Sequence, residues 1–552
     1  MKSLPLDRRH LLRHGLMLSA SSWLGACDRH PTKPVAAPGG QWVGADLDRG
    51  HRLRQIRTDD LDRQATGNPV HRVQALVIGA GVSGLAAARA LRLKGMEDVH
   101  VLDVEDSAGG NARAHLLGST ACPLGAHYLP VPETHRPMTE PLSRLLAFLE
   151  EVGLARQELG QWRFEELSLC HAPHERLFID GAWQEGLLPA AEPGSETDRA
   201  YRRMSEHIKA LQQSLNFGLP TLGQRWTPEL AALDAISLGD WLRRQGLTAS
   251  ESLLSYLDYC CKDDYGAGLE QVSAWAGVNY FASRHGFKAP AAGIEASQEP
   301  EGVFTWPQGN GWLTQRLSEP LANRFHAGQV ALSVREGIRR VETLVWNALT
   351  DRVETWQARH VVLAVPLKVA ARLWAQGPDE LKREAARVQQ APWLVANLQL
   401  SAPLLQRVGA SPAWDNVVWK PADSAFLGYV DATHQRLDPR PVAPVLTAYF
   451  ALPQAERASL ANPDLTPWIQ RVMASMAPLH PDLPGKLERI DLMRYGHAMR
   501  VPLPGTRNAI DLQRLQGLLP GRIQLAHADL AGYSVFEEAF EAGDRLRSWK
   551  HS

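Results

Sequence analysis

The fold is decided by the stretch Ala75-Leu-Val-Ile-Gly-Ala-Gly-Val-Ser-Gly84 and by the alanine-rich run that follows it, Leu85–Leu91. Four apolar residues predict a short buried strand, the glycines follow in the spacing GxGxxG, and the alanines predict a helix. In this arrangement Gly79 permits a tight turn, Gly81 lets the backbone approach a pyrophosphate, and Gly84 lets the helix pack against the strand. The pattern therefore predicts the strand, turn and helix of a dinucleotide-binding unit.

A second apolar run, Val99–Leu102, ends at Asp103, about 20 residues beyond the last glycine. At that distance a carboxylate is placed to accept hydrogen bonds from the ribose hydroxyls of an adenosine. The helix opens with Val82 and Ser83, whose unpaired N–H groups would face the phosphates at the positive end of the helix dipole. The sequence thus predicts an α/β domain with a parallel sheet and a bound dinucleotide.

A second glycine pair lies in Gly109-Gly110-Asn-Ala-Arg113 and supplies further N–H donors and a guanidinium for an anionic group. Nicotinamide-binding folds do not need this element. The stretch from Leu76 to Arg113 resembles the FAD-binding start of the flavin-containing amine oxidases. That family includes monoamine and polyamine oxidases, with phytoene desaturases and protoporphyrinogen oxidases as relatives. Its usual Gly-Gly-Arg is interrupted here, because Asn111 and Ala112 precede the arginine.

The resemblance implies an α/β fold in which a Rossmann-like FAD-binding domain is assembled from discontinuous segments and carries an inserted α+β substrate domain. The implied FAD-binding segments are residues 70–130, 300–375 and 487–547. The implied substrate domain comprises residues 131–299 and 376–486.

The resemblance also implies further contacts to a non-covalently bound FAD. The backbone at Val334 would meet the adenine, and Asp529 would hold the ribityl chain or the pyrophosphate. Val535 and Phe536 begin a C-terminal helix whose N-terminus would face the flavin ring, where the helix dipole stabilises negative charge.

The catalytic residues stay unknown at this point, and the candidates are His127, Tyr128, Asn397, Tyr495 and Tyr533. His127 and Tyr128 follow Gly125 in a stretch that the family brings beside the flavin; the alternative for His127 is a purely structural role. Asn397 is the residue nearest to the family's lysine, which bonds a water near flavin N5, and an amide cannot do the same electrostatic work. Val535 stands where many amine oxidases have an aromatic wall, which Tyr533 would partly replace.

The resemblance implies an FAD-dependent oxidoreductase of the amine oxidase type, which oxidises an amine or a similar small molecule by hydride transfer to flavin N5. The adjacent carboxylates Asp263 and Asp264 would suit a cationic amine, or would form a solvated helix end. The electron acceptor would be O2 or a periplasmic partner. One alternative is a desaturase-like or dehydrogenase-like flavoenzyme that passes electrons to a quinone or haem carrier. Another is a flavin-binding electron-transfer protein without catalysis.

Composition excludes several other classes. Lys and Arg total 59 against 60 Asp and Glu, and the net charge of -1 gives no overall field that favours nucleic acid. Hydrophobic residues make up 44%, which excludes a disordered chain. The 5 cysteines are too few and too irregular for a disulfide framework, and no spacing predicts a metal site.

The N-terminus has the pattern of an export signal. Arg8 and Arg9 precede a modest apolar stretch that ends in Leu24-Gly-Ala-Cys27, which resembles a twin-arginine signal merged with a lipobox. We therefore expect a signal peptide over residues 1–27, a possible lipid anchor on Cys27 as the one membrane contact, and a linker over residues 28–69. The expected location is the periplasm, free or membrane-anchored; without export the protein would be cytoplasmic.

Overall fold

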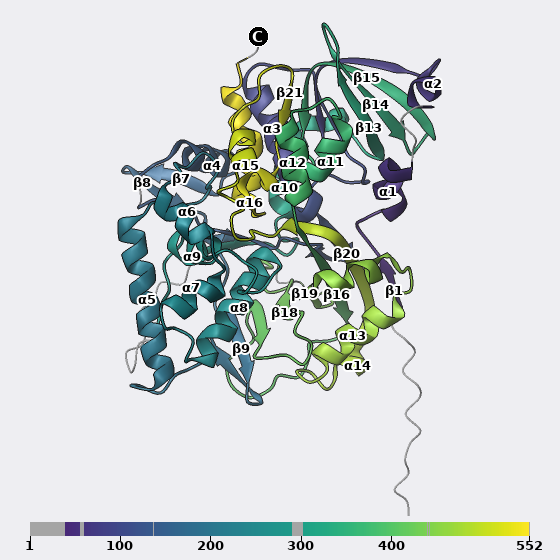
Figure 1. Cartoon of the computed structure of the whole chain (residues 1–552). Helices are drawn as coiled ribbons and strands as arrows, with labels where there is room; N and C mark the ends of the chain where they lie inside the picture. The colour runs from purple at the N-terminus through teal and green to yellow at the C-terminus, as the bar shows by residue number, and fades with distance from the viewer. Residues whose placement is uncertain are drawn as a thin grey trace, which may run out of the picture. The chain divides into compact units, whose positions relative to one another are not determined.

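A mixed sheet of seven strands forms the upper part of the molecule in Figure 1. The computed structural model describes residues 39–55, 60–135, 137–289, 302–438, 440 and 442–550, and the expected signal peptide with Cys27 lies outside them. The path of the sheet is β12-β3-β2-β15-β14-β13, and β21 also pairs with β15. Its strands are β2 (Val70–Ile78), β3 (Val99–Leu102), β12 (Phe325–His326), β13 (Gln329–Glu336), β14 (Val341–Asn347), β15 (Arg352–Leu363) and β21 (Ile523–Leu525).

The strands around β2 are parallel, because β2 pairs in parallel with both β3 and β15. Helix α3 (Val82–Leu93) follows β2 and packs against the C-terminal helix α16 (Phe536–Asp544). The two helices cross closely at Gly543, where a Cβ would lie 2.1 Å from the Ser83 carbonyl oxygen. Two segments that are far apart in the sequence are thereby fixed side by side at the carboxyl end of β2.

A second sheet of eight strands forms the lower part of the molecule, in the order β1-β20-β16-β19-β18-β17-β9-β10. Along β16 the side chains alternate: Trp393 and Val395 face one side, and Leu394 faces the other. The strands are β1 (Gly39–Trp42), β9 (Glu175–Ile179), β10 (Ala182–Glu185), β16 (Gln390–Leu400), β17 (Asp415–Val418), β18 (Phe426–Asp431), β19 (Val445–Ala451) and β20 (Leu487–Arg500).

Helices cover the second sheet on both faces. Residues of α5, α7, α8 and α9 share a buried cluster with Trp393 and Val395, whereas α13 packs on the face of Leu394. These helices are α5 (Glu196–Ser214), α7 (Leu238–Arg244), α8 (Glu251–Tyr265), α9 (Ala274–Ala282) and α13 (Thr466–Met476).

Helix α8 has clear start and stop signals. The Ser250 hydroxyl accepts a hydrogen bond from the Leu253 N–H at 3.2 Å, and Gly266 ends the helix with φ +66. Asp263 and Asp264 therefore lie in its last turn.

The remaining elements connect the two sheets or cover their edges. The helices are α1 (Leu47–Gln55), α2 (Leu61–Ala65), α4 (Glu140–Glu151), α6 (Pro228–Asp234), α10 (Gly311–Ser318), α11 (Leu367–Leu373), α12 (Asp379–Arg387), α14 (Leu483–Lys486) and α15 (Ile510–Leu515). The short strand pairs are β4 (Ala114–Leu117) with β5 (Thr120–Pro123), β6 (Tyr128–Pro130) with β11 (Val303–Thr305), and β7 (Ala155–Glu158) with β8 (Gln161–Phe164).

The structure differs from the expected segment boundaries in two places. Residues 39–55 and 60–69 are not a linker: β1 pairs with β20, and from Gly39 onward the chain forms one compact unit. Strand β20 lies in the second sheet, although residues 487–500 were expected in the FAD-binding domain. The reason is its length, because a strand of 14 residues carries the chain from the second sheet back toward the first.

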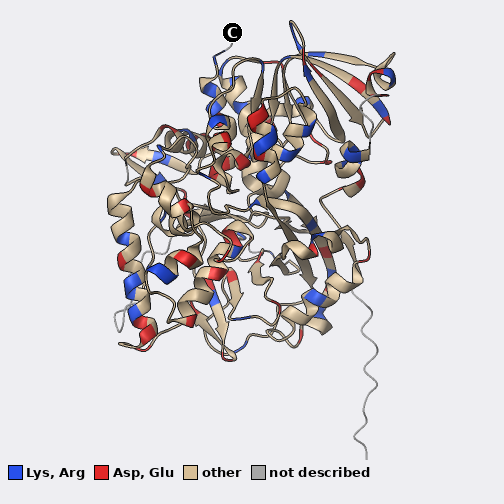
Figure 2. Ribbon diagram, in the orientation of Figure 1, with Lys and Arg blue, Asp and Glu red and all other residues tan. Residues whose placement is uncertain are grey.

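Charged residues of both signs are interspersed over the described molecule (Figure 2), in keeping with the net charge of -1. In the described part of the chain, no helix is both long enough and apolar enough to cross a bilayer.

Candidate active site

The turn between β2 and α3 needs its glycines for different reasons. Gly79 has φ +102, and a Cβ there would lie 2.3 Å from the Ala364 carbonyl oxygen. A Cβ on Gly84 would lie 1.8 Å from the Gly79 carbonyl oxygen, so the helix packs on the turn only with glycine. A Cβ on Gly81 would have one atom within 4 Å, Cα of Gly110 at 3.8 Å. Gly81 also caps α3 without a side-chain hydrogen bond, which leaves the helix N–H groups for a ligand.

The second glycine pair lies directly on this turn. The Gly109 N–H donates to the Ala80 carbonyl at 2.7 Å, and a Cβ on Gly110 would lie 2.9 Å from Cα of Gly81. Arg113 is buried and donates from Nε to the Gly110 carbonyl at 2.9 Å. Together the two turns form one floor of backbone groups with a guanidinium at its edge.

Asp103 stands at the end of β3, beside this floor. Its carboxylate accepts hydrogen bonds from the Ala80 N–H at 2.6 Å and from the Glu105 N–H at 2.9 Å. Each carboxylate oxygen has a second lone pair, which can accept from a ribose hydroxyl. Burial raises the pKa of Asp103, while the two N–H groups and Arg113 oppose that rise.

Asp529 lies on the opposite side, in the short helical turn before α16. The side chain is fully buried, and its Oδ2 accepts from the Leu367 N–H at 2.9 Å. Its Oδ1 accepts no hydrogen bond from a described residue and lies 3.4 Å from Nδ1 of His527. Burial works against ionisation, but His527 and Arg500 outweigh it and lower the pKa of Asp529. A buried carboxylate oxygen without a donor fits a ligand hydroxyl.

These elements enclose one cavity of about 560 Å³, which lies within the size range of small-molecule sites. It extends from β13 in the first sheet to β16 and β19 in the second. The predicted residues that line it are Gly79, Gly81, Val82, Ser83, Asp103, Gly109, Gly110, His127, Tyr128, Arg113, Tyr495, Asp529, Val535 and Phe536. Gly84 does not line the cavity, in agreement with its predicted packing role.

The geometry is that of a dinucleotide site that continues into a pocket at the N-terminus of α16. The sequence profile of the flavin containing amine oxidoreductases matches residues 82–546. The chain belongs to this family. Its cofactor is FAD, and the protein is an FAD-dependent oxidoreductase. The floor of glycines, Asp103 and the unpaired Asp529 oxygen fit the phosphates, ribose and ribityl chain of that cofactor.

Solved structures with a similar fold include two amine oxidases and an isomerase. Putrescine oxidase, solved with putrescine, is 17% identical with a TM-score of 0.60, over 87% of this chain and 99% of that one. Cyclohexylamine oxidase from Brevibacterium oxydans IH-35A is 16% identical, with a TM-score of 0.61 over 86% and 98%. A CLA-producing fatty acid isomerase from P. acnes is 14% identical, with a TM-score of 0.57 over 86% and 98%. These likenesses show the fold, and the isomerase shows that the fold alone does not decide the reaction.

Val334 does not line the cavity of the flavoenzyme. Its side chain is buried in the cluster that also contains Trp356, and the part of β13 that lines the cavity is Gln329–Ala331. The register of β13 against β14 shifts between Ala331 and Ser333. An irregularity in a strand changes which face each residue presents, so the sequence placed the adenine contact too far along β13.

Asn397 also lies outside the cavity. Its Nδ2 donates to the Pro123 carbonyl at 3.1 Å, and its Oδ1 accepts from the Thr447 hydroxyl at 2.7 Å. The residues of β16 that line the cavity are Gln390, Trp393 and Val395. The cavity wall therefore ends at Val395, two residues before Asn397. Trp393 and Val395 give this part of the wall its apolar character.

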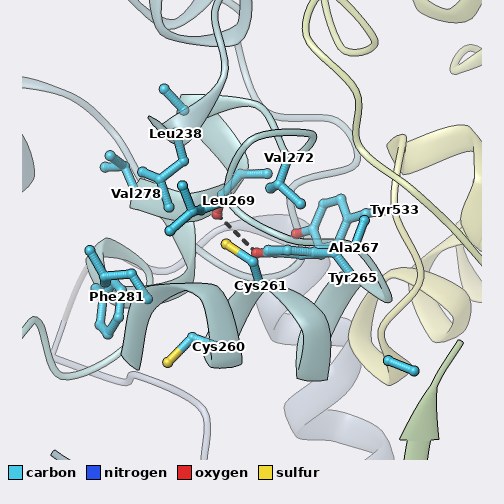
Figure 3. Packing of buried hydrophobic residues seen from close by; sticks show 14 of the residues in the cluster. Leu238, Cys260, Cys261, Tyr265, Ala267, Leu269, Val272, Val278, Phe281 and Tyr533 are labelled. Carbon is cyan, nitrogen blue, oxygen red and sulfur yellow. Dashed lines mark hydrogen bonds between the residues drawn. The ribbon is translucent and has the colours of Figure 1, made fainter. Parts of the chain in front are cut away.

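Tyr533 is a core residue and does not form a wall of the pocket. It packs edge-to-face against Tyr265 (Figure 3) and also against Trp275, with ring centroids 5.8 Å apart in both pairs. Its hydroxyl donates to the Glu538 carboxylate at 2.8 Å. Glu538 also accepts from the N–H groups of Thr221 and Leu222. This acid, in the first turn of α16, is thus held by three donors.

Aromatic side chains surround His127 at the second-sheet end of the cavity. Its ring centroid lies 4.6 Å from that of Tyr449 and 5.4 Å from that of Trp414. Burial lowers the pKa of His127 to about 4, so the ring is neutral near pH 7. The Tyr495 hydroxyl donates to the Leu124 carbonyl at 2.9 Å, which leaves its ring as the part that lines the cavity.

Carboxyl groups enter the same end of the cavity from α8 and α16. Asp264 pairs with Arg284 at 3.0 Å and accepts from the Tyr128 hydroxyl at 3.3 Å. Burial and the neighbouring Asp264 raise the pKa of Asp263 to about 7. Burial also raises the pKa of Glu537 to about 7. Both carboxyls therefore change charge close to neutral pH.

Sequence reasoning missed several cavity residues. Glu537 and Arg284 gave no pattern that connects them with Asp263, because they lie on α16 and just after α9. The alternation along β16 could have identified Trp393 and Val395 as a pair on one face. No group of three or more described His, Cys, Asp or Glu side chains is placed to hold a metal ion.

Proposed function

We propose that the protein oxidises a small cationic amine and that Asp263 and Glu537 receive the ammonium group. The supporting observation is that both carboxyls line the cavity, while the cation beside them, Arg284, is paired with Asp264 at 3.0 Å. Burial raises the pKa of both carboxyls although Arg284 opposes the rise, and a bound ammonium would supply a further cation beside them. Asp264 already has its cation in Arg284.

The chain contributes positioning, exclusion of water and a proton acceptor. FAD, when bound, supplies the two-electron oxidant. Trp393, Val395 and Tyr449 give the pocket an apolar wall, which favours the neutral form of an amine. A carboxylate of Asp263, with a pKa of about 7, is matched to take the proton that the ammonium must lose before oxidation.

The test is anaerobic reduction of the purified flavoenzyme by a panel of monoamines, diamines, alcohols and unsaturated acids. Reduction is measured as the loss of absorbance at ~450 nm. Amines should bleach the protein, and Asp263→Asn should raise the apparent amine Kd by about 10-fold or more. The control is Asp180→Asn, an exposed hairpin residue with φ 50 that asparagine also tolerates. Bleaching by neutral substrates but no amine would refute the proposal, and no bleaching at all would favour a non-catalytic electron-transfer protein.

A second candidate function concerns the electron acceptor. The family's lysine near flavin N5 has no counterpart in the described cavity wall, where β16 presents Trp393 and Val395 and no lysine reaches the cavity. This favours a dehydrogenase that passes electrons to a quinone or haem carrier. After anaerobic reduction, a soluble quinone should reoxidise the protein much faster than air. Equal rates with release of peroxide would identify an oxidase.

Export by the twin-arginine route is also part of the proposal, and it rests on the pattern Arg8-Arg9 and Cys27 in the sequence. Replacement of both arginines with lysine should leave the precursor in the cytoplasm. Unchanged export in a fractionation experiment would refute it.

A further inference from the structure

We propose that residues Gly39–Gln55, here termed the N-terminal cover, are part of the FAD site and close its adenosine end, with Arg49 as a cofactor-site residue. The segment precedes the glycine turn and lies outside the family match, which begins at residue 82. It contributes Ala45, Arg49, Gly50 and Leu53 to the lining of the cavity. The cover would therefore affect the binding of FAD and not the choice of substrate.

The first half of the cover is anchored on the second sheet. Strand β1 pairs in parallel with β20, with Gly40 opposite Ile490. The Trp42 indole donates to the Pro463 carbonyl at 2.9 Å, and the Arg494 guanidinium lies 4.4 Å from the indole ring centroid. These contacts fix where the chain leaves the sheet and enters α1.

The second half is tied to the loop that follows Asp103. The Asp46 N–H donates to the Glu105 carboxylate at 3.0 Å, and the Arg49 guanidinium pairs with Asp106. A third tie comes from Arg113, which donates to the Gly44 carbonyl as well as to the Gly110 carbonyl. The cover is therefore bonded to both the ribose-side loop and the phosphate-side turn.

The position of the cover identifies the end of the cofactor that it touches. Its cavity-lining residues share the cavity with Asp103–Glu105 and with Gln329–Ala331 of β13. Three carboxylates lie in this loop, at Asp103, Glu105 and Asp106, of which the first two line the cavity, and the cover adds Asp46, which pairs with Arg49 at 3.1 Å. Arg49 and Arg113 supply the compensating cations, so loss of Arg49 leaves a local excess of negative charge against the cofactor.

Substitutions at Arg49 and Gly44 test the proposal by calorimetric titration of deflavinated protein with FAD. Arg49→Met keeps the length of the side chain and should raise the Kd for FAD by about 10-fold, with an unchanged melting temperature of the apoprotein. Gly44→Ala should also weaken binding, because φ is +81 and the Cβ would lie 2.6 Å from Sδ of Met493. The matched control is Gly67→Ala, where φ is also +81 but no atom lies within 4 Å. Wild-type affinity in both Arg49→Met and Gly44→Ala would overturn the inference.

Hydrogen–deuterium exchange tests, without a substitution, whether bound FAD protects the backbone amides of the cover. FAD should slow exchange in peptides that span residues 43–55, for example at the Val43 N–H, which donates to the Leu492 carbonyl at 2.9 Å. ADP, which has the adenosine and the pyrophosphate but no flavin, should slow the same peptides, whereas FMN should not. Protection at residues 79–84 without any change at 43–55 would show that the cover does not contact the cofactor.

Discussion

The two ends of the cavity are built from different kinds of groups. At the dinucleotide end the contacts come from backbone amides, three close-packed glycines and carboxylates already held by N–H donors. At the substrate end they come from side chains: a neutral histidine, aromatic rings and carboxyls with pKa values near neutrality. The first end recognises a cofactor through fixed geometry, whereas the second is tuned by charge and pH.

The largest expected effect is at the backbone end. Gly81→Val should abolish flavin retention, with a loss of FAD affinity of about 100-fold or more, because its side chain would occupy space left for the pyrophosphate. The ratio of flavin to protein absorbance measures this directly. Gly485→Val is the control, since no atom lies within 4 Å of a Cβ there. Normal flavin content in Gly81→Val would contradict a backbone-built site.

A smaller effect is expected where a side chain meets the cofactor. Asp529→Asn should weaken FAD binding by about 10-fold, because the unpaired Oδ1 loses its charge as an acceptor. The Kd measured by calorimetry should rise while circular dichroism stays unchanged. An unaltered Kd would mean that the buried oxygen faces no ligand hydroxyl.

At the substrate end the comparison predicts a pH dependence that the dinucleotide end lacks. Asp263 and Glu537, with pKa values of about 7, are protonated below that pH and ionised above it. Amine binding should therefore strengthen as the pH rises from about 6 to about 8, until the ammonium itself loses its proton. Stopped-flow reduction over this range gives the apparent Kd, and Asp263→Asn should flatten the profile. A Kd that rises with pH would refute the role of the carboxyls.

The smallest expected effect is at Tyr533, which sequence reasoning placed in the site. Tyr533→Phe removes the hydrogen bond to Glu538, which keeps its two N–H donors, and should cost about 1 kcal/mol of stability. Thermal unfolding should show a small decrease in the midpoint, with an unchanged Kd for the amine. A changed rate of reduction by amines would restore Tyr533 to the site.

The residues that the glycine pattern predicted around Gly81 and Gly109 line one cavity, and they could be found from sequence because their determinants are local. Gly79, Gly81 and Gly84 lie within six consecutive residues: φ and close approach require glycine at Gly79, close approach requires it at Gly84, and Gly81 leaves open space beside the start of α3. Contacts that depend on strand register were less accessible at both ends: Val334 was predicted at the adenine and Asn397 near the flavin ring, and neither lines the cavity. A short offset within a strand is invisible in composition but moves a side chain out of the cavity.

The cover illustrates a different limit. Its residues have many charges and glycines, which is typical of a linker, and nothing in their order indicates a partner. Its structure depends on pairing with β20, more than four hundred residues later in the chain. Only the assembled fold shows that this segment belongs to the site.

Strand β20 pairs with the cover near Arg489, presents Met493 and Tyr495 to the cavity, and ends at Arg500, which donates to the Asp529 carbonyl at 2.7 Å. Because side chains alternate along a strand, insertion of a single residue near Leu492 would turn Arg494 inward and Tyr495 outward. The number of residues in β20 must therefore be kept, because this one strand positions the cover, the cavity wall and Asp529 together.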